Sequence, residues 1–234
     1  MQGFGEEGLF EWTGPLLEGA LVTLQIALLA YASGLLLGLL GASAKLSGNT
    51  LLYGIGMGYS TIVRAIPELL LIILLYYAGT QALNAALGAL GVEGAVSISG
   101  FVTAVVVLGF VQGAYMTEVI RGAIEAIPKG QIEAAKAFGL GPWTRFRRIV
   151  IPAALPNALP GLSNLWLILV KDTALISVVG FEELFFTAQQ AAASTRAYMT
   201  FYAAAGALYL VMTLGSNAIF ERIEARVRRG QPGV

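Results

Sequence analysis

The sequence predicts an all-α polytopic membrane protein with five transmembrane helices. Hydrophobic residues make up 57% of the 234 residues and charged residues only 12%, whereas a soluble domain carries roughly 25% charged residues. Five uncharged stretches are long enough to cross a hydrocarbon layer of roughly 30 Å as helices. With five crossings, the basic residues fall almost entirely on one side, as expected for a membrane protein.

The five spans follow from reading the chain from charge to charge. The uncharged runs comprise residues 19–44, 69–92, 94–117, 149–170 and 197–220. From them we place spans at about 16–42, 55–80, 97–120, 153–178 and 198–220 of a single domain, residues 1–234. The segment 46–63 is rich in Gly and hydroxyl residues, so we assign it to the interfacial start of the second span. Residues 79–97 are predicted to form an extramembrane connection.

The basic residues predict the orientation. With five spans, one side carries Lys45, Lys129, Lys136, Arg145, Arg147, Arg148, Arg222, Arg226, Arg228 and Arg229. The other side carries only Arg196. Basic loops stay in the cytoplasm, so the N-terminus is predicted outside and the C-terminus inside.

The composition also removes several classes of function. The chain has 14 basic and 14 acidic residues and neither Cys nor His. It therefore offers no thiolate nucleophile, no imidazole base and none of the usual zinc or haem ligands, and its balanced charge gives no reason to expect nucleic acid. The first 18 residues contain no Lys or Arg, so a cleavable signal peptide is not expected.

Charged residues inside or at the edge of the spans form three groups. They are Arg64 with Glu68, Glu118 with Arg121 and Glu125, and Lys171 with Asp172. Each charge costs roughly 2.5 to 3.5 kcal/mol in mid-membrane, so these side chains should face protein or water. Spacings of three and four allow ion pairs along one helix face, and the same charges are substrate-pathway candidates. Both interpretations stay open here.

Lys171 and Asp172 differ from the other groups because neighbours in sequence diverge by about 100° around a helix. One of the two therefore needs a partner on another helix or subunit. Pro67 removes a hydrogen bond within the second span and indicates a kink or a cavity. The pairs Gly34/Gly38 and Gly54/Gly58 are predicted to be helix-packing positions.

The connection over about 122–152 is long and is predicted to contain a short helix. Ala-rich residues favour the helix, Gly139 stands where a left-handed residue would end it, and Pro142 prevents its continuation. Ile132, Ala135 and Gly139 would line one face. Two or three turns are unstable alone in water, so this helix should dock onto something. The alternative is a basic anchor on anionic lipid.

The segment EAAKAFGLGPWTRFRRIVIP resembles the EAA loop of ABC importer permeases. The pattern is Glu-Ala-Ala, three residues, Gly, nine residues, then Ile-x-Leu-Pro. The chain matches it at Glu133, Ala134, Ala135, Gly139, Ile149 and Pro152, with Ile151 in place of Leu. The segments VRAIPELLL, GAYMTEVIRGAIEAIPKGQIEAA and LILVKDTALISVVGFEEL extend the resemblance to the polar amino acid subfamily, especially the permeases for histidine, lysine, arginine, ornithine and opines.

The resemblance implies a type I importer permease in the bacterial inner membrane. Its expected partners are a second permease, either the same chain or a homologue, a dimeric cytoplasmic ATPase, an extracytoplasmic binding protein, membrane lipid and an amino acid, with cationic ones preferred. Glu133 would contact the ATPase and Gly139 would permit the turn. The chain has no GxxxxGK[ST] loop, so no cofactor is expected on it, and ATP and Mg²⁺ belong to the partner ATPase.

Other functions compete with an importer of cationic amino acids. A permease for glutamine or glutamate is one alternative. A self-sufficient channel or secondary carrier could use the intramembrane charges, although carriers often show paired repeats and none is visible. An intramembrane enzyme is disfavoured by the absence of Cys and His.

Overall fold

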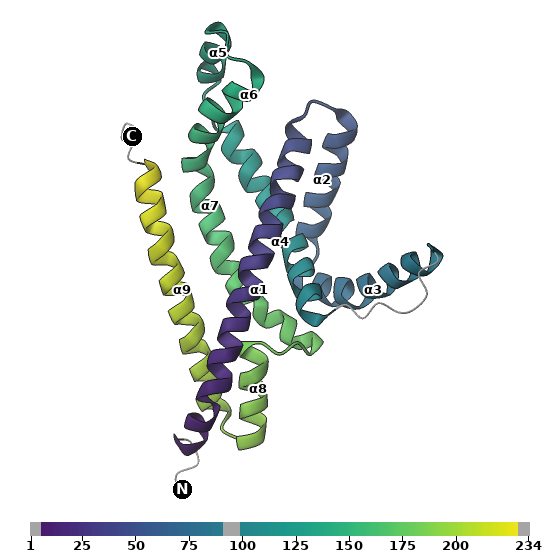
Figure 1. Cartoon of the computed structure of the whole chain (residues 1–234), viewed down its shortest axis with the longest axis vertical. Coiled ribbons are helices and arrows are strands. Elements are labelled where there is room, and N and C mark those ends of the chain that lie inside the picture. Colours follow the sequence, from purple (N-terminus) through teal and green to yellow (C-terminus); the bar gives the residue numbers. More distant parts are fainter. Residues whose placement is uncertain (1–5, 91–98, 229–234) are drawn as a thin grey trace.

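Helices form the described part of the chain, and no strand occurs in it. The computed structural model describes residues 6–90 and 99–228. Its elements are α1 Glu6–Leu46, α2 Thr50–Ala65, α3 Glu68–Ala89, α4 Gly100–Glu125, α5 Lys129–Ala137, α6 Pro142–Arg145, η1 Phe146–Val150, α7 Ile151–Asp172, η2 Thr173–Val179, α8 Leu184–Thr195 and α9 Tyr198–Arg228. In Figure 1, α5 and the C-terminal end of α9 lie at one end of the bundle, and the N-terminal end of α1 lies at the other.

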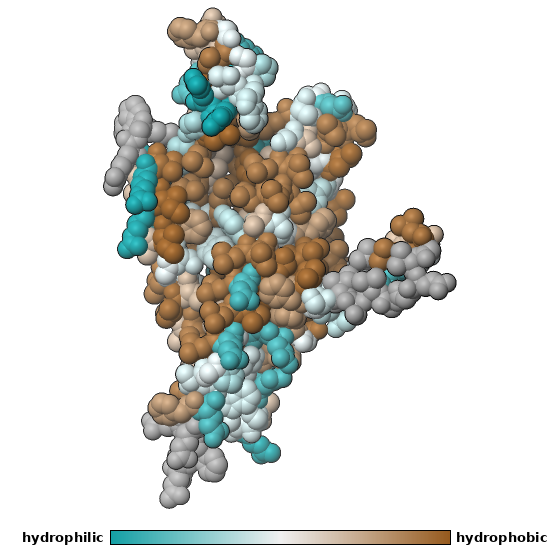
Figure 2. Space-filling view, viewed as in Figure 1, coloured by the Kyte–Doolittle hydropathy of each residue, from teal (hydrophilic) through white to brown (hydrophobic). Residues whose placement is uncertain are grey.

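The predicted number of five spans is confirmed. Within the described residues, five helical segments are long and apolar enough to cross a membrane: Leu9–Leu46, Glu68–Ala89, Gly100–Glu125, Pro142–Val179 and Tyr198–Arg228. Figure 2 shows a hydrophobic belt around the middle of the molecule and polar residues toward its two ends. Which residues of each helix meet hydrocarbon stays a prediction.

The second predicted span, 55–80, is two helices. Ile66 and Pro67 are extended, with ψ of 139° and 131°, and they separate α2 from α3. Proline disfavours the α conformation in the residue before it, which explains why α2 ends here. The connection predicted at 79–97 is helical as far as Ala89, and residues 91–98 lie outside the described part. In Figure 1, α3 projects sideways from the other helices.

Glycines bring α1 and α4 into direct contact. A Cβ atom added to Gly38 would lie 2.6 Å from Cβ of Met116, and one added to Gly113 would lie 2.7 Å from Cβ of Leu37. Such contacts are possible only without side chains, so the predicted packing role of Gly34 and Gly38 is confirmed. The same prediction is wrong within the described residues for Gly54 and Gly58, which have nothing within 4 Å of an added Cβ.

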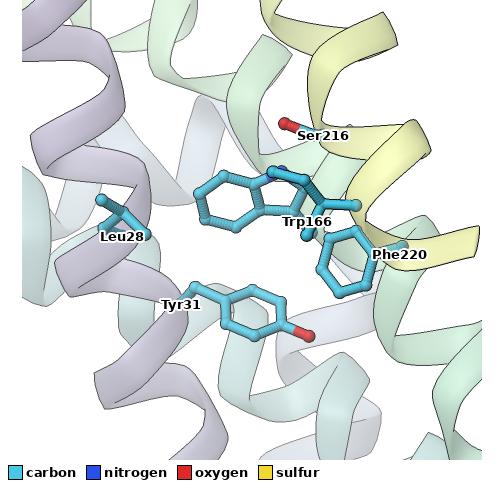
Figure 3. A pocket seen from close by; sticks show the side chains of 6 residues that line it. Leu28, Tyr31, Trp166, Ser216 and Phe220 are labelled. Atoms are coloured by element: carbon cyan, nitrogen blue, oxygen red, sulfur yellow. The ribbon is translucent and has the colours of Figure 1, made fainter. Parts of the chain in front are cut away.

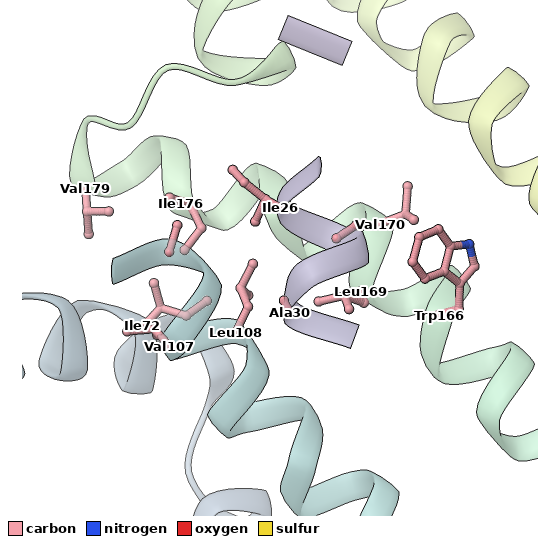
Figure 4. Packing of buried hydrophobic residues seen from close by; sticks show 12 residues of the cluster. Ile26, Ala30, Ile72, Val107, Leu108, Trp166, Leu169, Val170, Ile176 and Val179 are labelled. Atoms are coloured by element: carbon pink, nitrogen blue, oxygen red, sulfur yellow. The ribbon is translucent and has the colours of Figure 1, made fainter. Parts of the chain in front are cut away.

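The largest apolar cluster joins four membrane-crossing segments (Figure 4). Ile26, Ala27 and Ala30 come from α1, Ile72 from α3, and Ala104, Val107 and Leu108 from α4. Trp166, Leu169 and Val170 of α7 and Ile176 and Val179 of η2 complete it. This cluster fixes the C-terminal end of α7, and with it Asp172, against α4.

Glu183 ties together three helices beyond the end of α7. Its carboxylate accepts hydrogen bonds from the backbone N–H groups of Phe185 and Phe186 at 2.7 and 3.0 Å, which caps α8. It also accepts from the Thr23 hydroxyl at 2.9 Å and the Tyr209 hydroxyl at 2.8 Å. Burial raises the pKa of the Glu183 carboxyl, against the opposing effect of these donors.

Truncating Glu183 should therefore destabilise the bundle. Glu183→Ala removes the cap and takes the carboxylate acceptor away from the Thr23 and Tyr209 hydroxyl groups, with an expected cost of about 2 to 4 kcal/mol. Glu183→Gln retains an acceptor oxygen and no longer buries a charge, so it should cost less than half as much. Reversible unfolding in detergent measures both variants. Equal losses would contradict the proposed capping role.

Candidate coupling and pathway sites

The short helix α5 forms and ends as predicted. It covers Lys129–Ala137. Gly139 has φ of 70°, in the left-handed region. The N–H groups of Gly139 and Leu140 donate to the carbonyl groups of Lys136 and Ala135 at 2.9 and 3.1 Å. These two hydrogen bonds form a Schellman motif, which stops the helix and turns the chain.

The basic segment after this turn is a continuous helix that enters the membrane. Pro142 begins α6, because a proline at the first helical position needs no hydrogen-bond donor. The helix passes through the π-helical segment η1 and continues as α7. Pro152 lies in the first turn of α7 and has no N–H for the preceding carbonyl groups. The loss of one donor is consistent with the wider π turn there.

One face of α5 packs on the bundle and the other is open. Ala135 is buried, and Ile132 packs against a cluster formed by Ala123, Ile127, Ala154 and Ala158. Beside this contact lies a groove of about 650 Å³. Its lining residues are Gln131, Ala134, Ala135, Phe138, Leu140 and Ile149. Phe138 is 85% exposed at its edge, so the loop presents a preformed apolar site with Glu133 exposed on the same short helix.

A second feature is a charge cluster around Glu118, between α1, α2 and α4. Lys45 donates to Glu118 Oε1, and its ammonium group also reaches the Ser60 hydroxyl at 3.0 Å. Arg121 lies 3.0 Å from Glu118 Oε2 and 2.7 Å from Glu125. The predicted pairs on α4 are therefore confirmed. Lys45, predicted only as a topology signal, supplies the cation that links α1 to α4.

The prediction of an ion pair between Arg64 and Glu68 is wrong. No salt bridge joins these two residues in the described structure, where Arg64 lies 3.9 Å from Glu118 instead. The break at Pro67 removes the helical spacing on which the prediction depended. The Arg64 guanidinium carbon also lies 5.7 Å from the ring centre of Tyr115, within cation–π range.

A third feature is a group of hydrogen-bond acceptors around Asp172. Gln112 Nε2 donates to Asp172 Oδ2 at 3.4 Å, so Asp172 has the partner on another helix that the sequence predicted. Gln112 Oε1 is buried and has no hydrogen-bond partner among the described residues. Glu68 lies beside Asp172, close enough for its carboxyl group both to hydrogen-bond to that of Asp172 and to interact with its charge. Two adjacent carboxyl groups next to the Gln112 amide form an acceptor-rich group that suits a bound cation.

Lys171 lines a separate pocket of about 310 Å³ with Ala174, Phe185, Tyr202, Ala205, Gly206 and Tyr209. Its charge still acts on the neighbouring Asp172. The structure therefore joins Arg64, Glu118 and Arg121 in one cluster and places Glu68 with Asp172, beside Lys171. Among the residues described, no group of three or more Asp and Glu side chains is placed to hold a metal ion.

Comparison with known proteins decides the family. Residues 34–229 match the family model described as binding-protein-dependent transport system inner membrane component. The chain belongs to this family. As a permease of this family it is an integral membrane protein of the inner membrane. Membership favours the importer interpretation over a self-sufficient channel, a secondary carrier or an intramembrane enzyme.

Curated relatives cover nearly the whole permease. The octopine transport system permease protein of Rhizobium radiobacter is 41% identical over 100% of this chain and 98% of its own length. The nopaline permease of Agrobacterium fabrum is 44% identical, covering 94% and 93%. The histidine/lysine/arginine/ornithine permease of Escherichia coli is 42% identical, covering 95% and 97%.

Solved structures agree with the fold. A chain from the crystal structure of an amino acid ABC transporter with histidines superposes with a TM-score of 0.80 at 30% identity, covering 97% of this permease and 99% of that chain. A chain of the inward-facing MetNI methionine ABC transporter gives a TM-score of 0.78 at 22% identity, covering 94% and 99%. The predicted importer permease fold is confirmed.

Besides Lys45, sequence reasoning missed three residues of these sites. Gln112 and Tyr115 carry no charge. The signal that could have identified them as site residues is a polar side chain within an otherwise apolar helix. Phe138 is an aromatic residue inside the EAA pattern, and a pattern match does not show that its ring is exposed.

Proposed function

We propose that the chain is one of two permease subunits of an ATP-driven importer for a cationic amino acid or an opine. The acceptor group of Asp172, Glu68 and Gln112 carries this proposal, since an ammonium or guanidinium group would neutralise the two carboxylates and occupy the free amide oxygen. The relatives that transport histidine, lysine, arginine and ornithine support the same substrate class.

Glutamine is the main competing substrate, because the glutamine permease of Escherichia coli is 34% identical over 94% of this chain. A neutral amide would add no positive charge beside the two acidic groups, whereas a cation would add to the charge of Lys171 that already acts on Asp172. The observed excess of acceptors therefore favours the cation.

The proposed partners are a second permease, a dimeric ATPase and an extracytoplasmic binding protein. Closure of the ATPase dimer on ATP and Mg²⁺ would move α5, which sits in rigid contact with α7 through the cluster around Ile132. The permease pair would then switch between inward- and outward-facing states as rigid bodies. We propose that Glu133, Ala134, Ala135, Gly139, Ile149 and Pro152 form this coupling region.

The orientation with the N-terminus outside and the C-terminus inside belongs to the same proposal. It is supported by the basic residues and by the position of α5 and the C-terminal end of α9 at one end of the bundle. A C-terminal phosphatase fusion, active only outside the cytoplasm, should give no signal, and a C-terminal green fluorescent protein should fluoresce. The reverse result would rule out this orientation.

Asp172→Asn tests the substrate proposal. In proteoliposomes holding the copurified complex, we expect the variant to reduce arginine or lysine uptake by about tenfold or more, since one buried charge interaction contributes about 1.5 to 3 kcal/mol. Glu125→Gln is the matched control, because it also removes one carboxylate but lies at an exposed pair. If Asp172→Asn transports every cationic amino acid with the same KM and rate as the wild type, the proposed site is refuted.

A further inference from the structure

An apolar groove lies on the side of the bundle between α1, α7 and α9. It encloses about 260 Å³ and is lined by Leu28, Tyr31, Trp166, Ser216, Ile219 and Phe220. Figure 3 shows the rings of Tyr31, Trp166 and Phe220 gathered around it, one from each helix. All three helices belong to membrane-crossing segments, so the groove opens within the depth of the membrane.

Trp166 gives this groove an unused hydrogen-bond donor. The residue is only 7% exposed, and its indole Nε1 has no partner among the described residues. Figure 3 shows the nitrogen on the side of the ring near Ser216, whose hydroxyl donates to the Met212 carbonyl at 2.7 Å. A buried tryptophan N–H usually has an acceptor. This nitrogen lies on the Ser216 side of the groove, whereas the rings of Trp166, Tyr31 and Phe220 form its apolar wall. Trp166 is therefore a fluorescent reporter within the apolar part of the groove.

Two arginines continue the groove toward the C-terminal end of α9. Ile219, Arg222 and Arg226 follow one another at spacings of three and four and so share one flank of the helix. Neither arginine forms a salt bridge within the described structure. The two arginines repel each other, because like charges lie four residues apart on the helix. The neighbouring Glu221 does not pair with them but accepts a hydrogen bond from the Asn217 side chain at 2.9 Å. Arg226 lies about 10 Å along the helix from Ile219.

We infer that this groove is a binding site for an anionic phospholipid. Its acyl chain lies between Tyr31, Trp166 and Phe220, and its phosphate bridges Arg222 and Arg226. A helix of a second permease could fill the apolar part, but it would have to bring acidic groups of its own to the arginines. An apolar groove followed by two adjacent cations on the same flank of α9 therefore matches an anionic lipid.

Fluorescence quenching of Trp166 tests the site. Trp12→Phe and Trp143→Phe leave Trp166 as the only tryptophan of this chain, because the chain has three. The tryptophans of the partner subunits are replaced by phenylalanine as well. The full complex is reconstituted in vesicles containing dibrominated phosphatidylglycerol or dibrominated phosphatidylcholine. We expect the anionic lipid to bind about threefold or more better than phosphatidylcholine, since each arginine contributes roughly fivefold in affinity for an anionic lipid. In Arg222→Gln/Arg226→Gln, the ratio of the affinities for the two lipids should fall toward one.

Arg145→Gln/Arg148→Gln is the control, since it removes the same charge from the same end of the bundle but away from the groove; the lipid preference should persist. If the α9 variant fails to fold, Arg226→Gln alone and added salt should each lower the ratio. Equal quenching by the two lipids, or an equal effect of both double variants, would overturn the inference. Absence of quenching by either lipid would show that protein covers the groove and would also overturn it.

Discussion

Gly139→Val should strongly reduce ATP-driven uptake by the assembled complex while leaving membrane insertion intact. Gly139 has φ of 70° and ends α5 through the Schellman hydrogen bonds of Gly139 and Leu140. This left-handed conformation is strongly unfavourable for a β-branched residue, and holding valine in it costs about 1 to 3 kcal/mol. The chain would relieve this cost by moving Leu140 and reshaping the groove beside Phe138.

Gly141→Val is the matched control for this variant. Gly141 lies two residues further on, has ordinary extended dihedral angles with φ of −60° and ψ of 159°, and like Gly139 has nothing within 4 Å of an added Cβ. The two variants add the same side chain in equally open space and differ in backbone conformation. We expect at least about a tenfold loss of uptake in the first and near wild-type uptake in the second. Equal uptake by the two variants would show that the left-handed turn at Gly139 is not needed for coupling.

Glu133→Lys changes the exposed face of the same helix rather than its turn. Glu133 and Phe138 are both exposed, so reversing the charge should weaken capture of the ATPase without altering α5. Exposed aromatic residues beside a groove often dominate interface energy, and Phe138→Ala should have a similar effect. Copurification of the ATPase measures both. Normal assembly and uptake in both variants would contradict an ATPase contact on this face.

The local features of the coupling loop were predictable because they depend on neighbours in sequence. Helix propensity, the stop at Gly139 and the start at Pro142 act within a few residues. The pairs of Arg121 with Glu118 and Glu125 follow from helical spacing in the same way. Each needs only that the helix be continuous, which α4 is.

Contacts between distant segments were not predictable in this way. Lys45 and Glu118 are 73 residues apart, and Thr23 and Glu183 are 160 apart. The Arg64 prediction was wrong because one proline changed the chain direction between two residues assumed to share a helix. Pairing across helices depends on which faces pack, and the glycine contacts of α1 with α4 determine that here.

Glu118→Leu should cause the largest loss of stability of any single change in the charge cluster. The Lys45 side chain is 1% exposed, and without Glu118 its ammonium group would keep only the Ser60 hydroxyl at 3.0 Å and the Met57 sulfur at 3.5 Å. A buried charge that loses its partner costs about 3 to 5 kcal/mol. Lys45→Met should cost less, because Glu118 retains Arg121 at 3.0 Å.

The double variant Lys45→Met/Glu118→Leu should recover most of that loss, since an apolar pair of similar volume replaces a buried ion pair at little net cost. Unfolding free energies in detergent close the double-mutant cycle. Glu125→Leu is the control: its carboxylate also pairs with Arg121 but its side chain is 49% exposed, so the change should stay within about 1 kcal/mol. A loss in Glu118→Leu no larger than in the control would refute the buried pair.

Uptake by the double variant then distinguishes the two roles left open for Glu118. Lys45, Arg121 and Arg64 already surround its carboxylate, so little negative charge remains to attract a cationic substrate. If the cluster only holds α1 and α2 against α4, the refolded double variant should transport arginine near the wild-type rate. If Glu118 contacts the substrate, stability should return while uptake stays low. The same assay on Asp172→Asn should show the opposite behaviour, with little loss of stability and a large loss of uptake.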